Sequence, residues 1–246
     1  MRIIRSFLCM LCFAIFGIGA LGLGGLVFPI FLLVSRNKSR QRKLLAKSIH
    51  VSWRGFVWLM TAMRLISVRC SDKKRLRNLH GHIVVANHPS LIDVVILISL
   101  IPDCVCVVKQ SLFNNFWVKW VIRKIYLNND MPADEFIKRG TDFLANGYNI
   151  VIFPEGTRTV ANRKIRLHRG FAYLHMESKC PILPIHIENN PQILGKKQPW
   201  YDVGTKTSVY TITLKPDTEF TQRTTDNVRD TAIDITKQIS TAIFNA

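Results

Sequence analysis

A histidine and an aspartate lie five residues apart where a strand should give way to a helix. The apolar run 83–86 predicts a short buried strand, and His88 follows it closely. Pro89 fits the first position of a helix, which would put Asp93 about one and a half turns along it. From there the carboxylate can reach one imidazole nitrogen, fix the tautomer and leave the other nitrogen to take a proton from a hydroxyl group. For such a pair taken alone, a helix cap with satisfied polar groups is the simpler explanation.

A second junction of this kind lies some sixty residues further along the chain. The apolar run 149–153 predicts another buried strand, and the sequence Pro154-Glu155-Gly156-Thr157-Arg158 follows it. Glycine lets the backbone approach a ligand closely, and arginine offers a fixed cationic fork that suits phosphate. The second junction therefore favours a functional interpretation of the first.

Together the two stretches resemble a known family. Asn87-His88-Pro89-Ser90 with Asp93, followed by Phe153-Pro154-Glu155-Gly156-Thr157-Arg158, resembles the motifs of the glycerolipid acyltransferases, in particular the PlsC-like 1-acylglycerol-3-phosphate acyltransferases. The resemblance covers about residues 83–188. It implies that a fatty acyl group moves from an acyl thioester, either acyl-CoA or acyl carrier protein, to the hydroxyl of a lysophospholipid such as 1-acylglycerol-3-phosphate. It implies no metal and no bound cofactor, because the thioester is a substrate.

The resemblance also suggests a role for individual residues. His88 would be the general base, and Asp93 would orient and stabilise it. The remaining candidates would contact substrate: Glu155, Gly156, Thr157 and Arg158 at the second junction, Lys109 directly after a predicted strand, and Pro184 in the run 180–185, which matches a family motif that helps to line the acyl site.

One position departs from the family pattern. Asn129 stands where the family usually has an arginine that helps to hold the acceptor phosphate. The loss of such a charged fork would remove about 1.5–3 kcal/mol of binding. Arg158 remains, and Arg123 or Lys124 could compensate. The acceptor headgroup stays open, and the same chemistry on a lyso-aminolipid or a polyene or polyketide lipid is an alternative.

The charge of the chain points to a negatively charged partner. The 34 Lys and Arg residues exceed the 16 Asp and Glu residues, which gives a formal net charge of +18. Anionic lipid, an acidic carrier protein, a phosphorylated substrate or nucleic acid would each fit. A membrane-tethered nucleic-acid-binding protein is one alternative, but the catalytic half lacks the interleaved stacking aromatics it would need, so we expect no nucleic-acid partner. An inactive scaffold is the other, and the intact motifs argue against it.

The cysteines do not form a recognisable framework. Six of them are scattered along the chain, and the spacing of Cys104 and Cys106 does not fit a zinc knuckle. We therefore expect free thiols in a reducing compartment and no metal site.

The N-terminal segment predicts a membrane anchor. No charged residue occurs from Ser6 to Ser35, and about twenty apolar residues suffice for one span. The larger basic cluster, at 36–47, follows the segment, so the bulk of the protein should lie on the cytoplasmic side of the cell (inner) membrane. A cleaved signal peptide is disfavoured because the apolar run continues through 26–34. A re-entrant hairpin near Gly24–Gly25 or Pro29 is the alternative.

The following segment is rich in aromatic and basic residues. Residues 44–68 carry Trp53, Phe56 and Trp58 among several basic residues, which suits an amphipathic helix at an anionic membrane surface. An ordinary core-docked helix is the alternative. The expected organisation is therefore a membrane anchor at 1–40, an amphipathic membrane-associated helix at 41–72 and an α/β acyltransferase domain at 73–246.

Within the last of these regions, predicted strands alternate with helical stretches. Such alternation favours an α/β fold with a mainly parallel sheet flanked by helices. Residues 71–80 are expected to be a linker, and 163–169 a solvated or membrane-facing basic loop. The predicted strands are 83–86, 104–108, 125–127, 150–153, 182–187 and 209–214, and the clearest helices are 134–146 and 221–244.

Overall fold

A seven-stranded sheet runs through the middle of the protein, with the strand order β1-β7-β6-β2-β5-β3-β4. The computed structural model describes residues 2–34, 37–108, 123–159, 166–218 and 227–244. Neighbouring strands are parallel except for the antiparallel pair of β6 and β7. The predicted α/β class with a mainly parallel sheet is confirmed.

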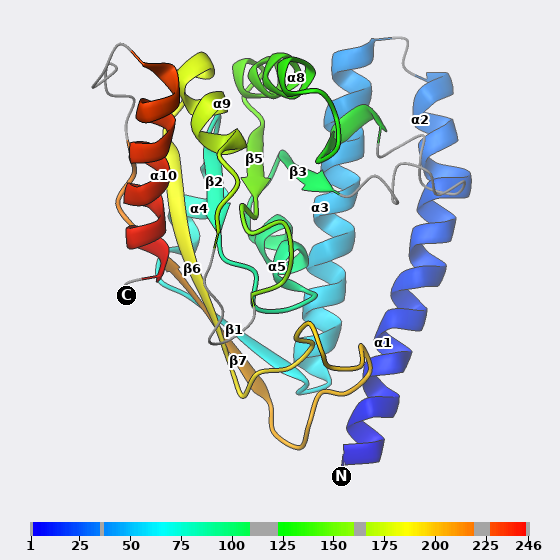
Figure 1. Ribbon diagram of the computed structural model, residues 1–246. Helices are drawn as coiled ribbons and strands as arrows, with labels where there is room; N and C mark the ends of the chain where they lie inside the picture. Colours follow the sequence, from blue (N-terminus) through cyan, green and yellow to red (C-terminus); the bar gives the residue numbers. More distant parts are fainter. Residues whose placement is uncertain (1, 35–36, 109–122, 160–165, 219–226, 245–246) are drawn as a thin grey trace.

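After the N-terminal helices, strands and helices mostly alternate along the chain, except that β7 follows β6 directly (Figure 1). The strands are β1 (Ile66–Cys70), β2 (Ile83–Ala86), β3 (Cys104–Val108), β4 (Leu127–Asn128), β5 (Asn149–Ile152), β6 (Ile182–Asn190) and β7 (Ser208–Leu214). The helices are α1 (Arg2–Gly22), the π-helical turn η1 (Leu23–Val27), α2 (Phe28–Val34), α3 (Lys38–Ala62), α4 (Lys73–Arg77), α5 (Asp93–Leu100), α8 (Ala133–Ala145), α9 (Gly170–Ser178) and α10 (Val228–Phe244).

The central strands are buried on both faces, so their sequences are continuous apolar runs. Along β2 the side chains alternate: Ile83 and Val85 pack in the cluster formed with α8, α9 and α10, whereas Val84 and Ala86 pack in the cluster formed with α1, α3 and α5. Figure 1 shows these two helical layers on opposite sides of the sheet. Each fully buried aliphatic side chain contributes about 1.5–3 kcal/mol, so the two clusters hold the strand ends in fixed positions.

The segment after α3 differs from the sequence prediction. The helix expected to continue to residue 68 ends at Ala62, and Arg64 takes a left-handed conformation with φ of 54°. Residues 66–70 then form β1, which pairs with β7 at the edge of the sheet. The prediction was wrong because the run Ile-Ser-Val-Arg-Cys alternates apolar and polar residues, which is typical of a strand. The linker expected at 71–80 also contains α4, which Asp72 caps by accepting a hydrogen bond from Arg75 N.

The N-terminal segment is helical almost throughout. The elements α1, η1 and α2 follow one another without a hairpin at Gly24–Gly25 or Pro29, and α3 runs back beside them (Figure 1). Residues 2–31 make up one helix long and apolar enough to cross a membrane. Its first turn is attached to the α/β domain, because Arg2 pairs with Asp202 at 2.5 Å and Arg5 donates to several backbone carbonyls.

Candidate active site

His88 and Asp93 come together at the carboxyl end of β2. The Nδ1 atom of His88 lies 2.9 Å from Oδ2 of Asp93. The aspartate side chain is fully buried, while the histidine side chain is 20% exposed. The sequence predicts a helix from Pro89 onwards. Instead the chain turns from 87 to 92, and α5 begins at Asp93, so the carboxylate sits in the first helical turn and faces back towards the ring.

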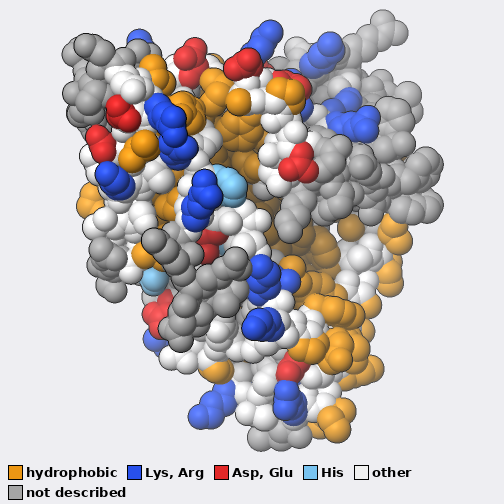
Figure 2. Space-filling view, in the orientation of Figure 1, with side chains coloured by type: hydrophobic (Ala, Val, Ile, Leu, Met, Phe, Trp, Pro, Cys, Tyr) orange, Lys and Arg blue, Asp and Glu red, His pale blue; other side chains and the backbone are white. Residues whose placement is uncertain are grey.

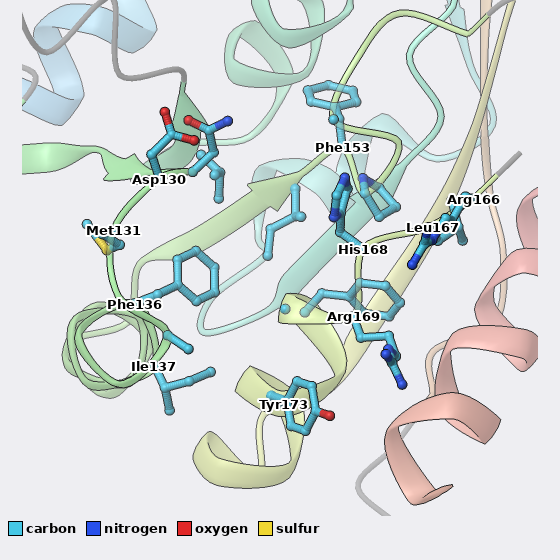
Figure 3. A pocket seen from close by; sticks show the side chains of 18 of the residues that line it. Asp130, Met131, Phe136, Ile137, Phe153, Arg166, Leu167, His168, Arg169 and Tyr173 are labelled. Carbon is cyan, nitrogen blue, oxygen red and sulfur yellow. The ribbon is translucent and has the colours of Figure 1, made fainter. Parts of the chain in front are cut away.

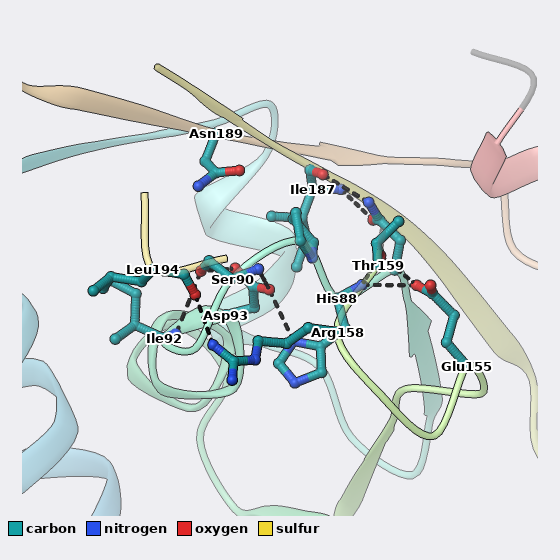
Figure 4. A network of polar contacts seen from close by, with 12 residues as sticks. His88, Ser90, Ile92, Asp93, Glu155, Arg158, Thr159, Ile187, Asn189 and Leu194 are labelled. Atoms are coloured by element: carbon teal, nitrogen blue, oxygen red, sulfur yellow. Dashed lines mark hydrogen bonds and ion pairs between the residues drawn. The ribbon is translucent and has the colours of Figure 1, made fainter. Parts of the chain in front are cut away.

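Asp93 is held by three donors (Figure 4). Ser90 donates from its backbone N to Oδ2 and from its hydroxyl to Oδ1, both at 2.6 Å. Behind it, the hydroxyl of Tyr210 on β7 donates to the Ser90 hydroxyl at 3.0 Å. A buried carboxylate with these contacts accepts the hydrogen bond from His88, so Nδ1 carries the hydrogen and Nε2 is the nitrogen with a lone pair.

The second junction meets the first because β2 and β5 are parallel neighbours. Their carboxyl ends lie at the same edge of the sheet, where sites of open α/β sheets commonly form. Phe153, directly after β5, stacks on the imidazole of His88 with ring centroids 4.4 Å apart. This contact holds the ring plane and shields one face of it from water.

Glu155 supports the backbone of the turn that carries His88. Its Oε1 atom accepts hydrogen bonds from His88 N at 3.0 Å and from the Thr159 hydroxyl at 2.6 Å. Thr159 N in turn donates to the carbonyl of His88 at 2.7 Å. Burial raises the pKa of the Glu155 carboxyl, and the hydrogen bonds from Thr159 and His88 offset this only in part.

Arg158 lies beside His88 and Asp93, and part of its guanidinium is hydrogen-bonded to the protein (Figure 4). Its Nη1 atom donates to the carbonyls of Leu194 and Gly195, at 3.0 and 2.9 Å. The same Leu194 carbonyl accepts a hydrogen bond from Leu91 N at 3.0 Å. Arg158 therefore ties the segment after β6 to the second junction, and Leu91 ties the same segment to the turn that carries His88.

Gly156 is required by its surroundings. It has φ of +64°, and a Cβ atom there would lie 3.1 Å from Nε2 of His168. His168 N also donates to the carbonyl of Pro154 at 2.7 Å. The start of the segment that leads to α9 is thus packed directly on the second junction.

A groove of about 1070 Å³ begins at Phe153, Pro154 and Gly156 and extends between α8 and α9. Its floor is apolar, with Phe136 and Ile137 from α8, and Arg166 and Arg169 form its basic side (Figure 3). Figure 2 shows the hollow, with hydrophobic side chains inside it and Lys or Arg side chains at its edge. The basic stretch 163–169 was predicted to be a solvated or membrane-facing loop, whereas Arg166 and Arg169 line this groove.

The other predicted site residues occupy varied positions. Thr157 is half-buried on the second junction. Pro184 is buried inside the sheet, where it pairs with Val85 of β2 rather than lining the groove. Asn129 lines the groove, and its backbone N donates to Val108 at 3.0 Å. Lys109 lies outside the described residues.

Sequence reasoning missed several residues that support the pair or line the groove. Thr159, Tyr210 and the groove arginines were not singled out, and Ser90 was taken only as a helix-start residue. Ser90 had a local signal, since a serine three residues before an acidic side chain often caps a helix. Within the described residues, no cluster of three His, Cys, Asp or Glu side chains could hold a metal ion.

The chain is similar to known proteins in sequence and in fold. Residues 67–188 match the acyltransferase family model. The matched part contains both junctions and most of the sheet, and the chain belongs to the acyltransferase family. The family predicted from the two motifs is confirmed.

Individual relatives carry more specific names. The 1-acyl-sn-glycerol-3-phosphate acyltransferase of Cocos nucifera is 27% identical over 143 residues, which cover 55% of this chain and 44% of that protein. The protein of the same name from Bacillus subtilis (strain 168) is 28% identical over 122 residues, covering 48% of this chain and 60% of that protein. The matched region thus spans about half the length of these relatives.

A solved structure shares the whole fold. The crystal structure of the 1-acyl-sn-glycerophosphate acyltransferase PlsC from Thermotoga maritima superimposes with a TM-score of 0.70. The alignment covers 97% of this chain and 95% of that one, at 19% sequence identity. The likeness extends beyond the sheet to the N-terminal helices.

Proposed function

We propose that this protein is an O-acyltransferase that moves a fatty acyl group from an acyl thioester to the hydroxyl of 1-acyl-sn-glycerol-3-phosphate. The observation that carries the proposal is the buried Asp93 carboxylate, 2.9 Å from Nδ1 of His88, whose ring stacks on Phe153 in the lining of an apolar groove. The names of the relatives supply the acceptor.

The chemistry follows from the orientation of the ring. With Nδ1–H donated to Asp93, Nε2 takes the proton of the acceptor hydroxyl as its oxygen attacks the thioester carbonyl. The positive charge that develops on the imidazole is stabilised by the buried carboxylate. The tetrahedral intermediate then collapses, the carbon–sulfur bond breaks, and the imidazolium can return the proton to the thiolate. The acceptor oxygen attacks directly, so Ser90 is not a nucleophile, and it supports Asp93 instead.

The groove offers separate environments for the parts of a lipid substrate. Its apolar floor suits an acyl chain, and Arg166 and Arg169 suit an anionic group. Arg158, whose Nη1 atom is bound to two carbonyls, can still present its other nitrogens to the acceptor phosphate.

A second candidate acceptor is favoured by Asn129. The amide lines the groove without the charge that the family usually places there. The same chemistry on an acceptor other than a lysophosphatidate, such as a lyso-aminolipid or a polyene or polyketide lipid, would suit this substitution. The donor, acyl-CoA or acyl carrier protein, is the other variable that an assay must separate.

Membrane association completes the proposal. The apolar helix at 2–31 is long enough to reach into a bilayer, and the basic chain suits an anionic surface. We place the catalytic domain on the cytoplasmic side of the cell membrane, in accordance with the basic cluster after the apolar segment.

An assay with purified full-length protein tests the function. Labelled acyl-CoA and acyl carrier protein are each offered with a panel of lysolipids, and the products are separated by thin-layer chromatography. His88→Ala should lower turnover about 100- to 10,000-fold, because a general base contributes this much. His80→Ala is the matched control, since His80 is exposed before β2 and should leave turnover unchanged.

The assay can also contradict the proposal. Equal turnover of wild type and His88→Ala would remove His88 as the base. Transfer only to acceptors other than 1-acyl-sn-glycerol-3-phosphate would support the proposed chemistry and contradict the proposed acceptor.

A further inference from the structure

We propose that residues 195–201, named here the aromatic–basic loop, form a contact site for an anionic phospholipid surface. The loop follows β6 and ends next to α1. This inference deepens the proposed function, on which it rests for the presence of a bilayer beside the protein. It assigns a lipid contact to a part of the α/β domain, in addition to the apolar N-terminal helix.

Two aromatic side chains of the loop are exposed. Trp200 is 49% exposed and Tyr201 is 42% exposed, and their rings meet edge to face at 5.7 Å. Exposed aromatic surface does not stabilise a fold in water. Tryptophan and tyrosine, with an apolar body and a polar tip, are enriched where a membrane meets water. The exposure of both rings therefore fits a lipid interface.

The loop also carries uncompensated positive charge. Lys196 and Lys197 are exposed, and neither forms an ion pair with any described residue. The stretch 189–201 contains no aspartate or glutamate, and the next acid, Asp202, is already bound to Arg2. Lysine side chains next to aromatic rings suit the phosphates of anionic headgroups, which attract basic groups near the surface.

The loop continues the apolar surface of α1. Trp200 packs edge to face on Phe13 at 5.5 Å, and the Cys9 thiol contacts the Trp200 carbonyl at 3.6 Å. In Figure 2 hydrophobic side chains gather over the lower part of α1 and the adjoining loop, with Lys or Arg side chains beside them. The exposed apolar side chains at this end of α1 are Ile3, Ile4, Phe7 and Met10. Lipid that covers α1 would therefore meet the loop as well.

The loop is fixed to the catalytic turn. Gly195 N donates to Oε1 of Gln198 at 2.8 Å, and Gln198 N donates back to the Gly195 carbonyl at 3.2 Å. Arg158 and Leu91 bind the carbonyls at the start of the loop. Lipid bound at the rings would thus hold the His88 turn at the bilayer surface, where a lysolipid presents its hydroxyl.

Fluorescence quenching tests the contact in the full-length chain. The protein is reconstituted into mixed phosphatidylcholine–phosphatidylglycerol vesicles with brominated acyl chains. The chain has five tryptophans, so the emission of Trp200 is taken as the difference between wild type and Trp200→Phe. We expect this emission to be quenched by the brominated lipid, and Lys196→Gln/Lys197→Gln to lose most of the quenching. The control is Arg229→Gln/Lys237→Gln in α10, on the opposite side of the sheet, which should keep it (Figure 1).

Each outcome decides for or against the loop. Trp200 emission quenched by aqueous iodide and untouched by brominated lipid would overturn the proposal. Equal quenching in vesicles of phosphatidylcholine alone would overturn the anionic preference. Because quenching needs no turnover, a quenched Trp200 in a protein that transfers no acyl group would support the contact and count against the proposed function. An active enzyme whose Trp200 is not quenched would support the proposed function and count against the lipid contact.

Discussion

Both carboxylate oxygens of Asp93 accept hydrogen bonds from the turn that carries His88. Ser90 donates to both carboxylate oxygens, and Tyr210 reaches Ser90 from a strand 120 residues away in sequence. Because each oxygen has its own donor, the plane of the carboxylate is fixed, and with it the direction of the imidazole. Burial raises the pKa of the Tyr210 phenol, so it stays protonated and able to donate over the range in which enzymes are assayed.

Tyr210→Phe should therefore weaken the support of the pair without removing it. The variant loses the bond to the Ser90 hydroxyl and the longer contact from Nδ2 of Asn189 at 3.5 Å. Loss of the shorter bond should lower the free energy of unfolding by about 1 kcal/mol. A loss of the same size from transition-state stabilisation would lower turnover about fivefold. Chemical denaturation and the acyl-transfer assay measure the two effects.

A matched variant shows whether the hydroxyl or the ring matters. Tyr148 is also buried, but its hydroxyl has no partner among the residues that the structure describes. Tyr148→Phe should leave stability unchanged or raise it, because it removes an unsatisfied buried group. If both variants behave alike, the Tyr210 hydrogen bond contributes nothing to the site.

Glu155 gives a pH dependence with a definite sign. Its pKa is higher in the folded protein than the usual value of 4.5, chiefly because burial disfavours the charge. As the pH rises past the usual value, the unfolded state loses its proton first, so the free energy of unfolding falls until the folded carboxyl has also ionised. The Glu155→Gln variant has no ionisable carboxyl group at this position, so its stability lacks this contribution to the pH dependence. Thermal melting across pH 4 to 7 should therefore show wild type losing stability relative to Glu155→Gln as the pH rises through this interval.

The control for this measurement is an exposed glutamate on α9. Glu177→Gln should show no such divergence from wild type, since Glu177 is exposed. A constant difference between wild type and Glu155→Gln at all pH values would contradict the burial argument.

The two strands that carry the motifs, β2 and β5, illustrate what could be predicted from sequence. Both are short apolar runs with polar junctions after them, and buried parallel strands have this appearance. Their adjacency was not visible in the pattern, but the motifs imply it, since both must reach one substrate. Strand β1 was missed because its alternation followed an aromatic helical stretch without a Gly or Pro to separate them. Contacts such as that of Tyr210 could not be predicted, because they depend on the order of strands in the folded sheet.

Arg158 connects two elements and gives a prediction about both. If its guanidinium holds the segment after β6, then Arg158→Ala removes two charge-assisted hydrogen bonds to Leu194 and Gly195. Such bonds contribute about 1.5–3 kcal/mol each, so amide exchange in peptides covering 190–199 should become at least about tenfold faster. Hydrogen exchange with mass spectrometry measures this.

A second arginine variant distinguishes a structural role of Arg158 from a role in substrate binding alone. Arg169→Ala is the matched control, because Arg169 lines the groove but makes no side-chain hydrogen bond to the loop after β6 among the described contacts. Unchanged exchange in Arg158→Ala would mean that the arginine serves the substrate alone.

The N-terminal helix is attached to the rest of the molecule at its first turns. The guanidinium of Arg5 donates to the carbonyls of Arg64, Leu65, Gly204 and Lys206 at 2.8–3.4 Å. Further along α1, Cys9 and Cys12 are buried against the domain. A helix docked in this way depends on Arg5 for the position of its start, and on apolar packing for the rest.

Arg5→Ala should therefore loosen the start of α1. We expect the thiols of Cys9 and Cys12 to react faster with a maleimide in detergent, because the helix leaves the domain more often. If the variant lowers the free energy of helix docking by about 1.4 kcal/mol, the rates should rise about tenfold. Peptide mass spectrometry measures the rate at each cysteine. Arg2→Ala should change the rates less, since that arginine is largely exposed and its pair with Asp202 is screened by solvent. Equal rates in wild type and Arg5→Ala would show that packing alone positions the helix.

The pairing of β1 with β7 sets an order for biosynthesis. As the ribosome synthesises the protein, the apolar N-terminal helix and β1 emerge first. The partner of β1 is β7, which is the last strand of the sheet to be translated. During most of translation this strand edge stays open, while α1 is already available to lipid. Early capture of the nascent chain at a membrane would keep the waiting strand away from other unfinished copies until residue 214 has left the exit tunnel.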